Sequence, residues 1–408
     1  MSIAQGINKI VTFRKQTGLN NIGSATGQIM RRESGTFNLT KSTFENNEIA
    51  QHQQSTGITH GLRSVTGALN GVLSPNTYSA FFGSILRKSF AAVTPITGKA
   101  ITIGAAVAGV YPLTVAAATL LTGGFKIGDV VRLSVGSLST ANLDANLLIV
   151  AMASETDVSV IPVNGDALIP EGPISGCTIT VVGKKTHAPT SGQTQEYWQI
   201  EEWSSDIATG GSRVFQDCVF GSADIGLPAE GNATVAFNLA GLDASFGNTQ
   251  VITSPTAETT TPVLTAVNGI VVANGVQVGL ITGATIKIDC GAANMGAVVG
   301  NNISPDIQRG RIKVSGQLTV FRQDGAFTTL FDDATEIAIS LIITDDGTKD
   351  SDFVGFTMSS VKFSGDTLDD GEKGLIQTMP FTAQLNGNGG AALANDKTII
   401  SIQDSLAA

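Results

Sequence analysis

The residues of this sequence that could most readily do chemistry are its three histidines, which lie far apart at His52, His60 and His187. General acid–base catalysis needs a side chain held beside positioned partners, and no motif around these histidines supplies them. The chain also has no GxSxG, HExxH, P-loop or GxGxxG motif. The histidines are therefore interpreted as structural or exposed, and no catalytic residue is predicted.

Adjacent acidic residues suggest a second chemistry, because glycosidases use two carboxyl groups that flank the scissile bond. The candidates are Asp332–Asp333, Asp345–Asp346 and Asp369–Asp370. Each pair falls in an expected turn or loop, where neighbouring carboxylates are usually solvated. The run DDGTKDSD faintly resembles a calcium loop but lacks the EF-hand spacing and its final Glu. A carbohydrate-active enzyme stays one hypothesis, while no metal and no cofactor is predicted.

The cysteines and aromatic residues offer no sharper site. Cys177, Cys218 and Cys290 lack CxxC or Cys/His spacing, so they are interpreted as buried thiols of a chain that matures in a reducing cytoplasm. The run EYWQIEEW places Tyr197, Trp198 and Trp203 beside three glutamates. It fits an aromatic ligand platform or, more ordinarily, a strand that packs into a core.

The composition indicates a β-protein with many turns. Only 14% of the 408 residues are charged, 47 are glycine, and the net charge is −10, which excludes a basic footprint for gripping DNA or RNA. The uncharged stretch between Lys99 and Lys126 has the length of a membrane span. It is rich in Ala, Gly and Thr and is broken by Pro112, so no membrane insertion is predicted. The N-terminus shows no apolar signal segment.

The chain repeats a pattern at an offset of 249, at which His60–Ile85 aligns with Arg309–Ala334. Identical residues are few, but each copy has a strand, about twenty polar or Gly-rich residues, a one-sided strand, a short amphipathic helix and three further strands. In the first copy Ser74 is the expected N-cap and Pro75 the first helical residue. In the second copy the expected cap is Asp324. The apolar stripe of the first helix consists of Tyr78, Phe81, Phe82 and Ile85.

The fold class expected is mainly β, with two tandem β-sandwich domains that each carry a flanking helix, plus an inserted small β-barrel or sandwich. Residues 1–88 and 194–248 would form the first domain, 89–193 the insertion and 249–408 the second domain. The insertion contains short β-runs spaced by turn residues, as in FKIGDVVRLSV and CTITVVG. Such insertions enter and leave their parent domain near one point on its surface.

The order of these motifs resembles the tail tube proteins of long-tailed bacteriophages. In that family a strand, an extended polar loop, a G-x-R-x-V-x-G-x-L strand and an S-x-x-T-Y helix follow one another. The matching residues in this sequence are Gly61, Arg63, Val65, Gly67, Leu69, Ser74, Thr77 and Tyr78. GGFKIGDVVRLSV also resembles the start of a small β-module that some members insert, and the C-terminal strands look like the last strands of a tube protein.

The resemblance implies a β-sandwich whose sheet joins its neighbours' sheets into a ring around a lumen, with the long loop reaching the next ring. Candidates to face the lumen are Ser64, Thr66, Asn70, Lys313, Ser315, Gln317 and Thr319, although a one-sided strand fits bulk solvent equally well. Candidates for the inter-ring loops are Glu45, Glu48, Gln51, His52, Gln53, Asn301 and Asn302.

Duplication then predicts three chains per pseudo-hexameric ring, with six chains as the alternative. The acidic chain predicts a neutral-to-negative lumen through which DNA passes without specific binding. Expected partners are the chain itself, tail-terminator and tail-tip proteins, and a tape-measure protein in the lumen. The expected location is the virion, after assembly in the host cytoplasm. The competing interpretation is a β-rich tail-tip or surface adhesin, whose outward-facing insertion would bind a receptor or carbohydrate.

Overall fold

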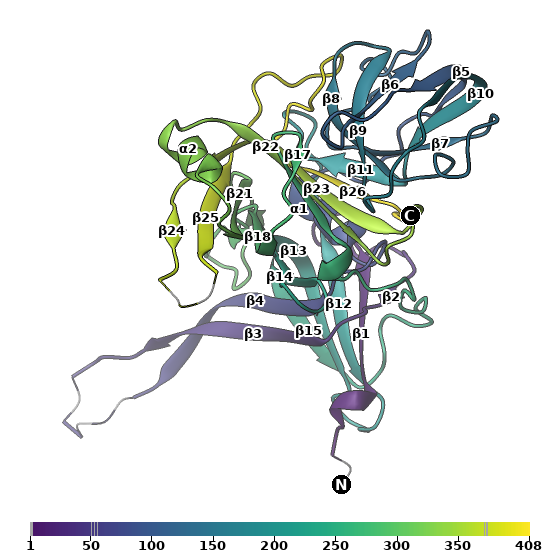
Figure 1. The fold of residues 1–408 in the computed structure, drawn as a ribbon. Helices are drawn as coiled ribbons and strands as arrows, with labels where there is room; N and C mark the ends of the chain where they lie inside the picture. Colours follow the sequence, from purple (N-terminus) through teal and green to yellow (C-terminus); the bar gives the residue numbers. More distant parts are fainter. Residues whose placement is uncertain (1–2, 50, 53, 55, 371, 373) are drawn as a thin grey trace.

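The structure of the chain is a computed structural model, and it describes all residues except 1–2, 50, 53, 55, 371 and 373. The fold is mainly β, as the sequence predicts. It consists of one extended sheet system, a closed six-stranded barrel, a small two-stranded sheet and two short α-helices in the described residues (Figure 1). No helix in the described part of the chain is both long and apolar enough to cross a membrane.

The first copy of the repeat forms a sandwich around α1. Its elements are β3 (Ser34–Glu45), β4 (Ile58–Val72), α1 (Ser79–Leu86), β12 (Trp198–Ser204), β13 (Ser212–Leu227) and β14 (Thr234–Gly241). One sheet runs in the order β3–β4–β14–β13. The N-terminal half of β13 turns into a second sheet with β12 and β15 (Asp243–Gly247). That sheet continues through β1 (Lys9–Lys15) to β2 (Gln28–Ile29).

The second copy repeats this plan. Its elements are β18 (Ile281–Asp289), β21 (Lys313–Phe321), α2 (Ala326–Asp332), β22 (Ile337–Thr344), β23 (Phe353–Phe363) and β25 (Ile376–Ala383). One sheet runs β18–β21–β25–β23, and the N-terminal half of β23 pairs with β22 and β26 (Ser401–Asp404). Short strands flank it: β11 (Lys184–His187), β16 (Ile270–Ala273), β17 (Val276–Gln277) and β24 (Thr367–Leu368). The 3-10 turns are Gly6–Asn8 and Ala266–Asn268.

The two copies share their strand register. Every β3–β4 pair from Ser34 opposite Asn70 to Thr40 opposite Ser64 recurs 249 residues later in β18–β21. A bulge also recurs, between Trp198 and Ile200 of β12 and between Ile337 and Ile339 of β22. The offset read from the sequence is therefore the offset of the strand pairing.

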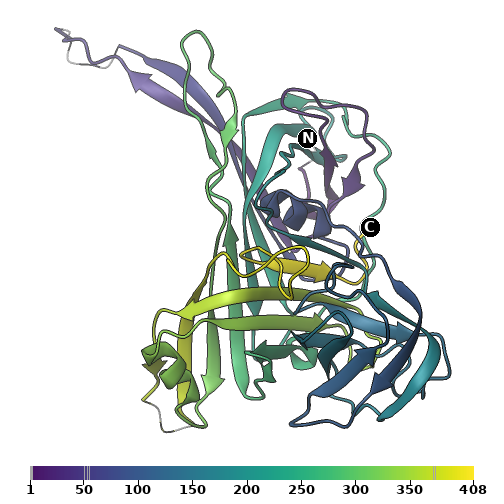
Figure 2. The same cartoon turned by 90° about the horizontal axis from the view of Figure 1, so that it is seen from above.

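A joint between β13 and β18 makes the two copies one continuous sheet. The C-terminal half of β13 pairs with β18 from Ser222 opposite Asp289 to Leu227 opposite Ala284. The sheet thus runs β3–β4–β14–β13–β18–β21–β25, with strands of both copies side by side (Figures 1 and 2). This joint shows, within one chain, how the strand edge of one copy meets that of the next.

The insertion is a closed barrel with its own core. Its strands are β5 (Ile96–Ile103), β6 (Tyr111–Val115), β7 (Val130–Ser134), β8 (Leu147–Met152), β9 (Asp157–Pro162) and β10 (Glu171–Val181). The uncharged stretch after Lys99 supplies half of β5 and all of β6. Its Ala, Gly and Thr residues form strands and turns around buried Ile101, Ile103 and Leu113. Figure 2 shows the barrel beside the second copy.

The start of the first helix was predicted wrongly. Ser74 is not an N-cap and Pro75 is not helical, because α1 begins at Ser79. Asn76 adopts a left-handed conformation with a φ of 64°, which interrupts a helical turn, and its N–H donates to Asp404 Oδ2 at 2.8 Å. The stripe itself is confirmed, since Tyr78 and the three residues that follow it in the pattern are buried. In the second copy Asp324 Oδ1 accepts the Ala326 N–H at 2.9 Å, one residue before the N-cap Gly325.

The long loops also differ from expectation. Both ends of the first one are strand, because β3 continues to Glu45 and β4 begins at Ile58, so the two strands form an arm that projects from the body (Figures 1 and 2). The second one lies beside the base of the arm and holds the two-stranded sheet of β19 (Ala293–Asn294) and β20 (Ile307–Gln308) (Figure 2).

Candidate functional site

One face of the continuous sheet carries the predicted polar positions. Directly opposed residues share a face, and one transverse row of them crosses seven strands. It consists of Ser34, Asn70, Ala236, Asp224, Lys287, Ser315 and Thr382. The core-side neighbours Leu69, Ile286 and Val314 are buried. Two of the predicted lumen residues, Asn70 and Ser315, therefore lie in one row although they belong to different copies.

The other predicted lumen residues lie on the same face. Ser64, Thr66, Lys313, Gln317 and Thr319 alternate with buried residues of β4 and β21. Thr66, Lys313 and Gln317 are exposed, whereas Ser64 and Thr319 are half-buried. Local contacts hold this face together: Thr40 Oγ1 lies 2.8 Å from Ser64 Oγ, and Asn70 Nδ2 donates to Ser34 Oγ at 2.9 Å.

This face is hollowed and nearly free of unbalanced charge. A hollow of about 630 Å³ follows the row across the joint and is lined by Asp224, Lys287, Ser315, Gln317 and Thr382, among others. Asp224 pairs with Lys287 at 3.5 Å, and Asp289 lies opposite Lys313 in the register. Asp224 and Lys287 were not predicted as site residues. Both could have been found from the sequence, because each occupies a polar position in a strand where polar and apolar residues alternate.

The arm carries most of the predicted inter-ring residues. Glu45, Glu48, Gln51 and His52 are exposed along it, while Gln53 lies outside the described residues. Large apolar side chains are exposed there too: Phe44 is 63% and Ile58 61% exposed. Phe44 lies opposite Thr59 and Glu45 opposite Ile58, so these side chains belong to a paired ribbon.

The two loops predicted to reach between rings meet at the base of the arm. Arg63 N donates to Asn302 O at 2.8 Å, and Asn301 and Asn302 are both exposed. A hollow of about 730 Å³ lies between the loops. Arg63 also pairs through Nη2 with Asp243 Oδ1 at 2.7 Å, which ties β4 to the strand β15. In the sequence Arg63 stood out only as part of the G-x-R-x-V-x-G-x-L pattern, which does not indicate its partner.

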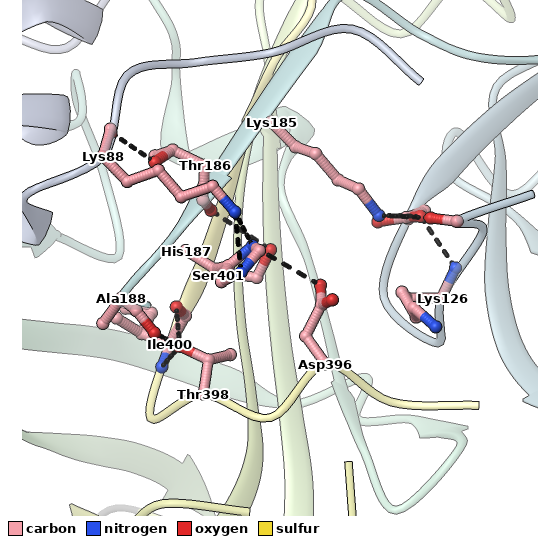
Figure 3. Close-up of polar contacts among 12 residues, drawn as sticks. Lys88, Lys126, Lys185, Thr186, His187, Ala188, Asp396, Thr398, Ile400 and Ser401 are labelled. Carbon is pink, nitrogen blue, oxygen red and sulfur yellow. Dashed lines mark hydrogen bonds and ion pairs between the residues drawn. The ribbon is translucent and has the colours of Figure 1, made fainter. Parts of the chain in front are cut away.

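A cluster of charged residues fixes the barrel to the rest of the chain (Figure 3). Lys185 Nζ and Asp129 Oδ2 lie 2.6 Å apart and are both buried. Lys88 Nζ lies 2.9 Å from His187 Nε2, and His187 Nδ1 lies 4.0 Å from Asp396. The cluster joins the end of α1, the strand β11, the barrel and the C-terminal segment. It holds these four parts of the chain together, and its residues Lys88, Asp129, Lys185, His187 and Asp396 are called the clasp below.

Burial sets the protonation of the clasp. It lowers the pKa of the His187 imidazole, and the cations Lys88 and Lys185 lower it further, against the opposing pull of Asp396. Burial also raises the pKa of Asp129, which the pairing with Lys185 opposes. His187 is thus neutral near pH 7 and structural in kind, as interpreted from the sequence.

Lys126 adds a tie between the barrel and the C-terminal segment. Its Nζ donates to the carbonyl oxygens of Gly390, Ala391 and Leu393, at 2.6 to 2.9 Å. Three acceptors around one ammonium group satisfy all of its protons. The barrel is therefore held by directional contacts as well as by apolar packing.

Among the other candidate site residues, Asp346 and Trp198 make structural contacts. Asp346 Oδ1 accepts bonds from the N–H and the hydroxyl of Thr348, at 2.8 and 2.6 Å, as an acidic residue in a turn does. Trp198 is buried and donates from Nε1 to Ser84 Oγ at 3.1 Å, and its ring packs on Phe81. The described residues hold no group of three or more metal-ligating side chains.

The comparison with known families bears on this arrangement. A family model described as phage tail tube protein matches residues 7–383. The chain belongs to the phage tail tube protein family. The match runs from the first strand through the barrel to the end of β25, so it includes the first copy and the second copy except β26. No curated protein matches the sequence closely enough to be cited as a relative.

Membership settles the broad role of this tail tube protein. It is a structural component of the phage virion, and its family forms tubes by self-assembly.

Proposed function

We propose that this tail tube protein polymerises into stacked rings, and that each chain supplies two of the six tube domains of a ring. The joint between β13 and β18 supports this most directly. Six residue pairs join the two copies edge to edge, which makes the chain a ready-made pair of ring segments. Three chains would then complete a ring, with six as the alternative.

The ends of the continuous sheet support closure. Among the described residues, β3 pairs with β4 alone and β24 with β25 alone. Unpaired strand edges are templates for pairing with another chain, and a closed ring removes them. The outer edge of β3 at one end and of β24 at the other are therefore the surfaces expected to meet.

The hollowed polar face is the expected lining of the lumen. Hydroxyl and amide side chains with paired charges would neither attract nor strongly repel a polyanion, so DNA could slide past without binding. The same face would contact the tape-measure protein before ejection. The net charge of −10 must then lie mostly on other surfaces of the chain.

The arm is the expected contact between rings. It leaves the body with exposed Phe44 and Ile58, which need a partner surface. Tail-terminator and tail-tip proteins would meet the first and last rings. The division of the chain into domains stays a prediction, with residues 1–88 and 194–248 in the first domain, 89–193 in the insertion and 249–408 in the second domain. Assembly in the host cytoplasm also stays a prediction. The barrel beside the second copy would lie on the tube exterior.

Electron microscopy of the purified full-length protein tests the proposal. Class averages along the axis should show rings or tubes with a hollow centre and three peripheral barrels. Six barrels would keep the tube and exclude the two-domain subunit. Compact particles that never become annular, even when seeded with tail-tip complexes, would contradict self-assembly.

A further inference from the structure

The inference below rests on the proposed ring and concerns the surface through which one chain meets the next. The internal joint shows what such a contact requires. The helix of the first copy packs on the second copy: the rings of Phe82 and Phe356 lie 5.8 Å apart. Arg87, at the end of α1, donates from Nη2 to Gly310 O at 2.5 Å. A copy thus binds its neighbour through its helix as well as its strand edge.

The corresponding helix of the second copy lacks such cover. Phe331 matches Phe82 at the offset of 249, yet Phe331 is 37% exposed and Phe82 is 2% exposed. Leu368 corresponds to Ile225, because the two residues lie opposite equivalent positions of β25 and β14. Leu368 is 41% exposed, whereas Ile225 is 2% exposed. Large apolar side chains are therefore uncovered where the first copy has them buried.

The other end of the chain offers a matching surface. In the second copy, Phe356 of β23 lies opposite Ile402 of β26, and both are fully buried. The corresponding pair in the first copy is Arg213 of β13 opposite Phe246 of β15. Phe246 is 56% exposed, and the Arg213 guanidinium lies 5.9 Å from its ring centroid.

We propose that a second copy of this chain covers the open end in the register of the internal joint. If the contact between chains has the register of the β13–β18 joint, each residue of that joint is replaced by the equivalent residue of the other copy. Thr367 then lies opposite Asn38 of the neighbour, and Asp369 lies opposite its Thr36. The same register also sets Phe331 against the neighbour's Arg213 and Phe246. A phenylalanine on a cation and a second ring gains both apolar burial and a cation–π contact.

The strand register can be tested by cross-linking. Thr367, Asn38 and Ser34 are exposed, and the native cysteines are buried, so introduced thiols would react selectively. The full-length double variant Thr367→Cys with Asn38→Cys should give a ladder of linked chains ending at three after mild oxidation. In the matched control, Thr367→Cys with Ser34→Cys, the second thiol lies four residues away, roughly 13 Å along the strand, and should stay unlinked.

The outcomes separate this inference from the proposed function. A ladder to six would support the joint and overturn the three-chain ring. Equal linking of both pairs, or of the control alone, would overturn the register. Rings visible by microscopy without any linking would overturn the register while the tube function stands. Absence of rings in the unmodified protein would contradict the function itself.

The apolar contact has its own test. Phe331→Ala should raise the concentration needed for half-maximal ring formation by roughly tenfold, as for a central interface aromatic. Ile169→Ala, which removes an exposed apolar side chain from the barrel, should leave that concentration unchanged. Phe246→Ala should weaken assembly like Phe331→Ala, and the double variant should add little. Full additivity, or no effect of Phe331→Ala, would overturn the contact.

Discussion

The two copies have the same strand register but opposite surroundings. In the first copy, α1 lies under aromatic side chains of both copies, and Phe81 stacks on Phe220 with ring centroids 4.1 Å apart. In the second copy, α2 has no buried residue in the monomer. Similar amphipathic stripes therefore differ in burial because of what packs on them. The difference in burial supports the proposal that another chain covers the helix of the second copy.

The largest effect is expected where the copies differ most in burial. Phe81→Ala should lower the free energy of unfolding by about 5 kcal/mol, because it empties the centre of an aromatic cluster. Its counterpart Leu330 is half-buried, so Leu330→Ala should cost about 1 kcal/mol. Urea unfolding of the unassembled chain measures both. Equal losses would contradict the contrast between the copies.

The clasp around the barrel sharpens the comparison, because the insertion belongs to the first copy alone in the described chain. Asp129→Asn leaves Lys185 buried without its carboxylate and should cost about 4 kcal/mol. Asp224→Asn removes an exposed ion pair from the sheet face and should cost less than about 1 kcal/mol. Thermal unfolding provides the readout. Similar shifts in the two variants would show that the clasp does not stabilise the barrel.

Asp404 ties the end of the second copy to the turn before α1, and this tie is expected to depend on pH. Burial raises its pKa to about 6, against the backbone N–H bonds of Asn76 and Leu406. The folded state therefore holds the proton more tightly than the unfolded state, whose carboxyl titrates near 3.8. The stabilising contribution is complete below about pH 4 and is lost as pH rises through about 6.

This group should lower the free energy of unfolding by up to about 3 kcal/mol between pH 4 and pH 7. Asp404→Asn should flatten that part of the pH profile, since the amide does not titrate. Urea unfolding at several pH values compares the two proteins. Parallel profiles would rule out Asp404 as the titrating group.

The arms should give the smallest change in stability. Replacing Phe44 and Ile58 by alanine should change the free energy of unfolding by about 0.5 kcal/mol or less, because both side chains are exposed. It should nevertheless shorten tubes while leaving single rings intact. Electron microscopy measures tube length, and unchanged lengths would argue against the arm as a contact between rings.

Much of the fold could be predicted from the sequence because it depends on local patterns of polar and apolar residues. The alternation of Val65, Gly67 and Leu69 with polar residues marks a one-sided strand, and its echo at Val314, Gly316 and Leu318 marks the repeat. These signals depend on period and spacing, which a single sequence displays. The polar face followed from them directly.

What failed depended on contacts between distant residues. The start of α1 was missed because Asp404, more than three hundred residues away, holds Asn76 in a non-helical turn. The clasp could not be predicted, since Lys88, Asp129 and Asp396 come together around Lys185 and His187 only through the tertiary fold. Phe82 and Phe331 occupy the same place in the pattern, so the sequence could not show that one is covered and the other exposed.

The joint between β13 and β18 has a consequence for the kinetics of assembly. Both strands belong to one chain, so they meet at the high effective concentration that a covalent linker imposes and need no diffusional encounter. In a ring of three chains, half of the joints would form during folding and only the other half would depend on protein concentration. Ring assembly would then be a lower-order reaction than that of six single-domain subunits, with fewer incomplete intermediates to dissociate.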